Sequence, residues 1–445
     1  MRAKKAQKNL LDFVLKFSTF VLVGLIPINL GRHFWPEYSY VLGIRVDYLS
    51  PTVFVSDLIA AFLIITFLIS LFFKYQKISK TILYLIIVLF VFTLIFLGSS
   101  FFRADFWLGI YQLFRIVQTF LLAIIISVVL NTKRDQRILF LILAAAIIFE
   151  SALAFLQFYF QASMGLKILG EGSFNSQTPG ISLVDLYGKQ LLRPYGTFPH
   201  PNVLAGFLTI TLPLIYYQLT SEIKIKVRYF LILGLFCGLF ILGLSFSRTA
   251  WVATLACFVL IGVLTKGKSL VKNLLRNPKQ LTLIIILIIT FFGLFGPLVL
   301  ERFITLSSTD VHTVSLRSKL NSSAIEMFKD SPLVGVGFGR FLTNLPQYFV
   351  ISETIRVIQP VHNIVLLILA ESGLVGLGIL LIMFYLVIAF LLVKIRKKEI
   401  FAKILISTLL GIFIISNFDH YLFTLNQGRL MLALILGLSL TRTTS

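Results

Sequence analysis

The chain has 445 residues, of which 58% are hydrophobic and only 13% are charged. This composition excludes an ordinary soluble domain and predicts a membrane protein. A net charge of +22 would suggest nucleic-acid binding in a soluble protein. In a membrane protein, basic residues cluster in the cytoplasmic loops and indicate the topology, so we expect no nucleic-acid partner.

Apolar stretches long enough to cross the hydrocarbon core of a bilayer predict about twelve transmembrane helices. In chain order the predicted spans are 13–31, 52–73, 80–98, 106–130, 137–160, 202–219, 228–244, 249–265, 280–300, 362–393, 400–420 and 428–441. The predicted fold class is an all-α polytopic membrane protein, with residues 1–445 forming a single integral membrane domain. The run GLVGLG in the tenth span predicts that this helix is broken or kinked.

Lysine and arginine cluster in every second predicted loop, and all these clusters lie on the side of both termini. The positive-inside rule makes that side the cytoplasm. We expect the protein to be integral to the bacterial cytoplasmic (inner) membrane, with both termini cytoplasmic. The clusters are Arg2/Lys4/Lys5/Lys8, Lys74/Lys77/Lys80, Lys133/Arg134/Arg137, Lys224/Lys226/Arg228, Lys266/Lys268/Lys272/Arg276/Lys279 and Lys394/Arg396/Lys397/Lys398/Lys403.

Two long loops lie on the opposite, extracytoplasmic side, at about 161–201 and about 301–361. The second, between the ninth and tenth helices, is the larger. Within it, residues 317–329 have helical character and are followed by a glycine-rich turn, PLVGVGFGRF.

Several arginines on the outer side run against the positive-inside trend. Guanidinium is always charged and binds phosphate oxygens bidentately, so this set suits an anionic group such as a diphosphate. Arg248 lies in a very short outer turn, where an unpaired charge would be costly. For each arginine the alternative is an ordinary surface residue near anionic headgroups. The set comprises Arg193, Arg248, Arg317, Arg340 and Arg356.

Two histidines mark the ends of the outer loops. His362 opens the tenth span and is a candidate general base near neutral pH. Glu371, deeper in that span, is either a supporting functional carboxylate or a structural one. His200 and Asn202 lie where a proline-rich loop enters a helix, and their alternative role is loop structure, with Asn202 capping the helix.

Arg115 and Glu150 lie at similar depth in two consecutive antiparallel spans. Neither charge would be tolerated alone in lipid. We therefore predict a structural ion pair between them.

Motifs for metal chemistry are absent from the sequence: it has no HExxH, no Walker A loop, no CxxC and no outward DxD. The outer acids, such as Asp185, Asp310, Glu326 and Asp330, are scattered. The two cysteines lie in apolar stretches and read as packing residues. We expect no metal and no cofactor, with arginines in place of a metal ion.

Four segments in order resemble the O-antigen ligase/O-antigen polymerase superfamily. They are RPYGTFPHPNVLAGFL, SFSRTAWVA, SLRSKLNSSAIEMFKDSPLVGVGFGRF and HNIVLLILAESGLVGLG. ESALAFLQ, with Glu150 and Gln157, also fits, so the resemblance covers about 150–380. His200 departs from the family pattern, in which asparagine or another small polar residue is commoner before Pro-Asn.

The resemblance implies a membrane glycosyltransferase of the GT-C type, active in lipopolysaccharide or other polysaccharide biosynthesis. It would transfer a glycan from undecaprenyl diphosphate to a hydroxyl of a glycan, lipid A core or other acceptor. By motif position His362 would be the catalytic base, and Arg193 and Arg248 would bind the diphosphate. Arg317, Arg340, Glu371, His200 and Asn202 would support them.

Other functions remain open from the sequence. Within the family, a ligase and an O-antigen or exopolysaccharide polymerase are not separated. From another class, a lipid-linked oligosaccharide flippase or a transporter would also have many spans, although its ionisable residues would be expected near the membrane midplane. A non-enzymatic scaffold would leave the outward arginines unexplained.

Overall fold

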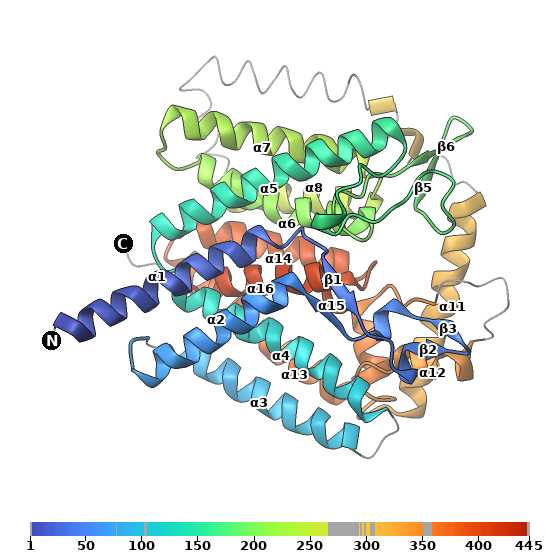
Figure 1. The fold of residues 1–445 in the computed structure, drawn as a ribbon, viewed down its shortest axis with the longest axis horizontal. Helices are drawn as coiled ribbons and strands as arrows, with labels where there is room; N and C mark the ends of the chain where they lie inside the picture. Colours follow the sequence, from blue (N-terminus) through green and yellow to red (C-terminus); the bar gives the residue numbers. More distant parts are fainter. Residues whose placement is uncertain are drawn as a thin grey trace.

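The computed structural model describes residues 2–76, 78–101, 105–265, 293, 296–297, 300–302, 308–349 and 358–442. In this part of the chain, eight helices are long and apolar enough to cross a membrane (Figure 1). They are α2 (Val55–Phe72), α3 (Lys80–Phe101), α4 (Phe106–Val129), α5 (Lys133–Phe160), α6 (Pro201–Leu219), α7 (Ile225–Leu244), α8 (Arg248–Thr265) and α13 (Ile364–Arg396). Three further helices, α1 (Arg2–Gly24), α14 (Ile400–Ser416) and α16 (Asn426–Leu440), pack among them.

The all-α polytopic class predicted from the sequence is confirmed. Each predicted span except 280–300 overlaps one of these helices. Most of 280–300, the basic cluster at 266–279 and Arg356 lie outside the described residues. The largest difference is at the first span, where α1 ends at Gly24, because Pro27 lacks a backbone donor and restricts the residue before it.

The helices form an inner group and an outer group. In α4 and α6, 72% and 78% of the span is buried, and α16 packs on both. In α2 and α3 the buried share is only 33% and 28%, and apolar side chains such as Phe62 and Phe90 are exposed. An apolar exterior is expected of helices that face lipid tails.

Short irregular elements gather at one end of the bundle, on the right of Figure 1. Strand β1 (Gly31–His33) pairs with β4 (Thr52–Phe54), β2 (Tyr40–Val41) with β3 (Ile44–Arg45), and β5 (Leu183–Leu186) with β6 (Lys189–Leu192), all antiparallel. The 3₁₀ turns η1 (Glu37–Ser39), η2 (Asp47–Leu49) and η3 (Lys167–Leu169) lie in the same segments.

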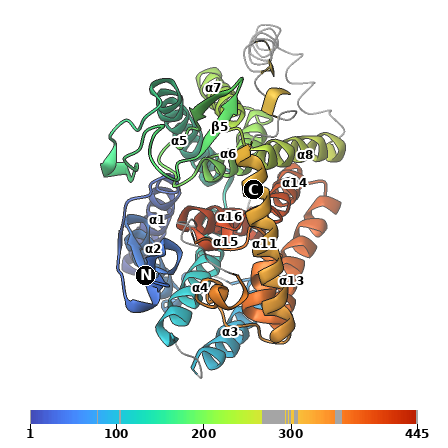
Figure 2. The same ribbon diagram turned by 90° about the vertical axis from the view of Figure 1, so that its right-hand side faces the viewer.

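Three helices complete this end: α11 (Ser308–Asp330), α12 (Phe341–Tyr348) and α15 (Tyr421–Thr424). Figure 2 shows α11 lying across the end of the bundle beside α13, on which it packs. The helix predicted at 317–329 is thus confirmed and is longer than predicted. Helix α1 begins at the opposite end, toward which α16 also runs (Figure 1).

Helix α13 is kinked at Gly373, as the GLVGLG run predicted. Gly373 has φ 59° and ψ −159°, a conformation that only glycine adopts readily. The kink frees backbone amides that the glycine-rich turn then satisfies: Leu374 N donates to Pro332 O (2.8 Å) and Val375 N to Leu333 O (3.1 Å). A Cβ on Gly373 would lie 2.4 Å from the Leu333 carbonyl carbon. The glycine-rich turn therefore packs so closely against the kink that only glycine fits at position 373.

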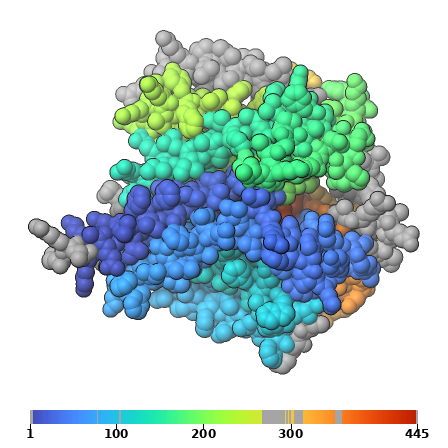
Figure 3. Space-filling model, in the orientation of Figure 1, coloured from blue at the N-terminus to red at the C-terminus, as the bar shows by residue number. Residues whose placement is uncertain are grey.

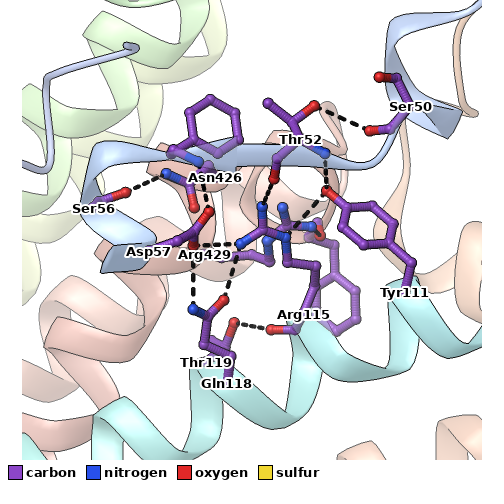
Figure 4. Close-up of polar contacts among 12 residues, drawn as sticks. Ser50, Thr52, Ser56, Asp57, Tyr111, Arg115, Gln118, Thr119, Asn426 and Arg429 are labelled. Atoms are coloured by element: carbon purple, nitrogen blue, oxygen red, sulfur yellow. Dashed lines mark hydrogen bonds and ion pairs between the residues drawn. The ribbon is translucent and has the colours of Figure 1, made fainter. Parts of the chain in front are cut away.

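The predicted ion pair between Arg115 and Glu150 is wrong. Arg115 Nη1 pairs with Asp57 Oδ1 at 2.5 Å, and its Nη2 donates to the carbonyl of Thr52 (Figure 4). The Glu150 carboxylate instead accepts from the backbone N and the Oγ1 of Thr197, each at 2.8 Å. Both side chains are buried, but each pairs with a group on another segment of the chain.

Glu150 and Gln157 of α5 together hold the loop that leads into α6. Gln157 Oε1 accepts from Tyr195 N (3.0 Å) and Gly196 N (2.8 Å). Gly196 has a φ of +61°, and a Cβ there would lie 2.3 Å from Glu150 Oε2. The loop is therefore fixed in place by residues from the preceding membrane helix.

Candidate functional site

A polar cavity of about 1020 Å³ opens at the end of the bundle that carries the short irregular elements. Its walls come from the β1–β4 segment, the loop between α5 and α6, the turn between α7 and α8, helix α11, the turn before α13 and the α14–α16 connection. The space-filling view shows the surface hollowed between the blue β1–β4 segment and the green β5–β6 segment (Figure 3). Segments from the whole length of the chain thus meet at one site.

The cavity gathers most of the residues singled out from the sequence. These are Arg193, His200, Asn202, Arg248, Arg317 and His362. They come from four segments that the sequence places up to 169 positions apart (Arg193 to His362). The two outer loops and the short turn after α7 therefore meet at one cavity.

Arg340 and Glu371 lie outside the cavity lining. Arg340 Nη2 donates to Asp105 O at 3.1 Å, while Glu371 accepts from the backbone N of Gly339 (2.9 Å) and of Phe341 (3.1 Å). Both residues fasten the glycine-rich turn, Arg340 to the start of α4 and Glu371 to α13. This geometry gives them a structural role, the alternative that the sequence left open for Glu371.

His362, Asp419 and His420 form a tight cluster at the centre of the cavity wall. The rings of His362 and His420 meet edge to face, with centroids 4.9 Å apart. One nitrogen or oxygen of each residue lies within 4.8 Å of those of the other two. Asp419 Oδ1 accepts from the backbone N of His420 at 2.9 Å, which fixes its carboxylate against both rings.

The histidines of the cavity are neutral and Asp419 is ionised at neutral pH. Burial lowers the pKa of His200 and of His420 to about 3. Burial also lowers the pKa of His362, where the Asp419 carboxylate raises it and Arg317 lowers it further. Burial raises the pKa of Asp419, but the neighbouring histidines and Arg317 outweigh burial and lower it. His362 is therefore present as a base.

Arg193 is tied to this cluster through Asn202. Arg193 is 8% exposed and donates to Ser245 O (2.8 Å), Ser182 Oγ (3.0 Å) and Asn202 Oδ1 (2.8 Å). Asn202 Nδ2 in turn donates to Asp419 Oδ2 at 3.0 Å. Asn202 thus orients a cation and an anion at once and is not the helix cap that the sequence suggested.

The cap of α6 is His200. Its Nδ1 accepts from the backbone N of Asn202 at 3.1 Å, and Pro201 occupies the first helical position, where its missing N–H costs nothing. This contact explains why a histidine can stand at this position. The ring is half-buried, and it serves the loop structure through this contact.

Asp419, His420 and Arg429 are cavity residues that were not singled out from the sequence. The predicted span 400–420 included Asp419 and His420 in a transmembrane helix, because the apolar stretch continues almost to Asp419. Helix α14 in fact ends at Ser416. The signal that was available is the Asp-His pair itself, in NFDHY between two apolar spans.

Arginines outnumber carboxylates in the cavity lining. Its cations are Arg45, Arg193, Arg248, Arg302, Arg317 and Arg429, and its acids are Asp47, Asp185 and Asp419. Because all titrating histidines described above are neutral, the excess charge is positive. The cavity is electrostatically suited to an anion.

His362, Asp419 and His420 have the donor types that a divalent metal ion binds. Both Asp419 oxygens, however, already accept hydrogen bonds from the protein, and Arg317 adds a positive charge beside all three groups. These features disfavour a dication. The residues fit an orienting carboxylate with two neutral rings better than a metal centre.

A bundle of long apolar helices with a polar cavity at one end defines a polytopic integral membrane protein. Residues 233–381, from α7 to the middle of α13, match the family model described as O-Antigen ligase. The match supports the likeness of this region to the O-antigen ligase/O-antigen polymerase superfamily. No curated protein matches the chain.

Arg248, Arg317 and His362 fall within the matched region, whereas Arg193, Asp419 and Arg429 lie outside it. The cavity is therefore assembled from the matched domain together with the segments before and after it.

Proposed function

We propose that this protein is a glycosyltransferase that moves a glycan from undecaprenyl diphosphate to an acceptor hydroxyl on the extracytoplasmic face of the cytoplasmic membrane, without a metal ion. The observation that carries the proposal is the meeting of a neutral histidine, His362, with Asp419 and with the arginines Arg193, Arg248 and Arg317 around one cavity. A GT-C-type architecture accords with the helical bundle and with the polar cavity at one of its ends.

The arginines account for the departure of the diphosphate. A polyprenyl diphosphate is already a good leaving group, so the reaction needs neutralisation of the charge that builds on it more than a strong general acid. Positioned guanidinium groups supply that neutralisation without reorganisation. Arg193 is held by three hydrogen bonds, so its orientation is fixed before substrate binds.

His362 accounts for activation of the acceptor. The acceptor oxygen attacks the anomeric carbon, its proton passes to His362, and the electron pair of the breaking bond leaves with the diphosphate. Asp419 stabilises the imidazolium that forms, in the manner of the carboxylate in a catalytic triad. Direct displacement of this kind inverts the anomeric configuration.

The extracytoplasmic assignment depends on the distribution of charge. Basic clusters at the start of α1 and of α5 and at the end of α13 lie at the end of the bundle away from the cavity. The positive-inside rule makes that end cytoplasmic, so the cavity faces the other compartment.

The test is transfer by the purified protein from a lipid-linked glycan, followed as release of undecaprenyl diphosphate, with and without EDTA. Removing a general base is expected to cost roughly 10²–10⁴-fold in kcat, so His362→Ala should lose activity to that extent. Arg134→Gln, an exposed residue at the start of α5, is the matched control and should keep full activity.

Two results would contradict the proposal. A correctly inserted His362→Ala protein with normal turnover would remove the base, and loss of wild-type activity in EDTA would show that a metal ion is required. Turnover of donor and acceptor by the purified protein would exclude a pure flippase or transporter.

Ligase and polymerase are separated by the products in cells that lack the protein. Loss of a polymerase removes long chains but leaves single units attached to the acceptor. Loss of a ligase leaves the chains on undecaprenyl diphosphate. The acceptor is therefore lipid A core or another molecule in one case and a second lipid-linked glycan in the other.

A further inference from the structure

Arg429 is a buried cation of the cavity wall that the mechanism above does not use. It is the fourth residue of α16, is 6% exposed and lines the cavity. Its Nη1 donates to Phe423 O at 3.2 Å. Among the described residues, no carboxylate forms an ion pair with Arg429, and its Nε and Nη2 have no protein acceptor. These two nitrogens remain accessible from the cavity.

The nearby carboxylate, Asp57, is already occupied. Its Oδ1 accepts from Arg115 Nη1 (2.5 Å) and Gln118 Nε2 (3.2 Å), and its Oδ2 accepts from Phe54 N (2.8 Å). Figure 4 shows Arg115 and Arg429 gathered beside this one acid. The polar cluster therefore holds two guanidinium groups against one carboxylate and carries an excess positive charge.

Two further groups add to the positive potential beside Arg429. Tyr111 lines the cavity, and its hydroxyl oxygen accepts from Arg115 Nε and Thr52 N, both at 3.2 Å. With its oxygen so occupied, the Tyr111 hydroxyl proton points away from these donors and is available to an anion. Helix α16 begins here without a side-chain cap, so its first turn adds the positive end of a helix dipole.

Arg429 is separate from the arginines beside His362. The charged groups that act on His362 and His420 include Arg317, whereas those that act on Arg429 are Arg115 and Asp57. Helix α15 lies between the two places: His420 caps its start, and Phe423 at its end accepts from Arg429. A helix of this length separates them by roughly 6 Å along its axis.

We propose that Arg429, Tyr111 and the first turn of α16 form a second anion subsite, which binds a phosphate group of the acceptor while the acceptor hydroxyl reaches His362. This rests on the proposed function. Guanidinium and a helix N-terminus are the donors that phosphate oxygens bind best. The subsite takes either a lipid-linked diphosphate or a phosphorylated sugar of a lipid core, which share this chemistry.

The test compares acceptors with and without their phosphate, using the full-length protein. Acceptors are an undecaprenyl-diphosphate-linked glycan and a phosphorylated lipid A core, the latter also after phosphatase treatment. We expect Arg429→Gln to raise the KM for the phosphorylated acceptor about tenfold, the size of one lost charged contact. The KM for the donor, kcat and use of the dephosphorylated core should stay within about twofold, and Arg429→Lys should restore part of the affinity.

Each other result overturns the subsite. An equal rise in KM with the dephosphorylated core would show a structural role, and a rise in the donor KM would place Arg429 in the donor site. An unchanged KM would show that Arg429 binds nothing. The acceptor whose KM responds identifies which source of phosphate the protein uses.

Binding of inorganic pyrophosphate, measured by calorimetry without turnover, separates failure of the subsite from failure of the proposed function. We expect Arg429→Gln to lose one of two binding events while keeping the wild-type unfolding temperature, and the control Arg134→Gln to keep both. A titration identical to that of wild type would refute the subsite even if transfer is observed. If the wild-type protein transfers nothing but the variant loses one event, the proposed function fails and the anion site stands.

Discussion

Asp419 connects the groups that the proposed reaction needs. One of its oxygens accepts from the backbone of His420 and the other from Asn202, which is also bonded to Arg193. Its charge raises the pKa of His362 against the effects of burial and of Arg317. It is thus placed to stabilise His362 once that ring has taken a proton.

Replacing Asp419 by asparagine is expected to lower kcat by roughly 10²-fold or more, because the protonated ring loses its counter-charge. Activity requires neutral His362, so it falls as the pH falls through the pKa of that ring. Since the carboxylate raises this pKa, Asp419→Asn should move the acid limb of the kcat profile to lower pH.

The measurement is kcat as a function of pH for wild type, Asp419→Asn and the control Glu326→Gln, an exposed residue of α11. A shift of the acid limb to higher pH in Asp419→Asn would contradict this role. An unchanged profile with normal kcat would show that Asp419 only orders the α14–α15 connection.

At the scale of elements, the structure depends on the match between the kink of α13 and the glycine-rich turn. Gly373 opens the helix, and the backbone of the turn fills the gap. Glu371 binds the amides at the far side of the same turn. The sequence predicted the break from its glycines but not the segment that docks into it.

Gly373→Ala is expected to destabilise the protein by about 1–3 kcal/mol, because alanine resists the conformation at this position and its Cβ would meet the backbone at Leu333. Gly378→Ala is the matched control in the same helix, since a Cβ there meets nothing within 4 Å. Thermal unfolding in detergent measures both. Equal unfolding temperatures would show that the kink is not required.

At the scale of the whole molecule, charge is divided between the two ends of the bundle. One end carries the basic clusters of α1, α5 and α13, and the other carries a cavity rich in arginine. The first pattern predicts the orientation of the protein in the membrane, and the second suits an anion. The cavity end is built from segments that are too polar to enter the bilayer.

A membrane-impermeant thiol reagent applied to spheroplasts is expected to label Lys189→Cys, at the exposed end of the β5–β6 hairpin, but not Lys397→Cys, at the end of α13. The reason is that the positive-inside rule places the two residues on opposite faces. Labelling of Lys397→Cys before lysis would reverse the topology and move the cavity to the cytoplasm. The native Cys257 is buried and Cys237 is half-buried in α7, so background labelling should be low.

The sequence by itself determined the helical class, the positions of most helices, the likeness to the ligase family and several residues of the cavity, including His362 and Arg193. These are local properties, because hydropathy, basic clusters and short motifs are each written in a few neighbouring residues. Only the tertiary structure decided which side chains meet. Arg115 pairs with Asp57 across 58 positions and Asn202 with Asp419 across 217, and no spacing along the chain predicts such partners. A buried charged side chain is stabilised by an oppositely charged or polar group close to it in space, and the packing of the helices decides which group that is.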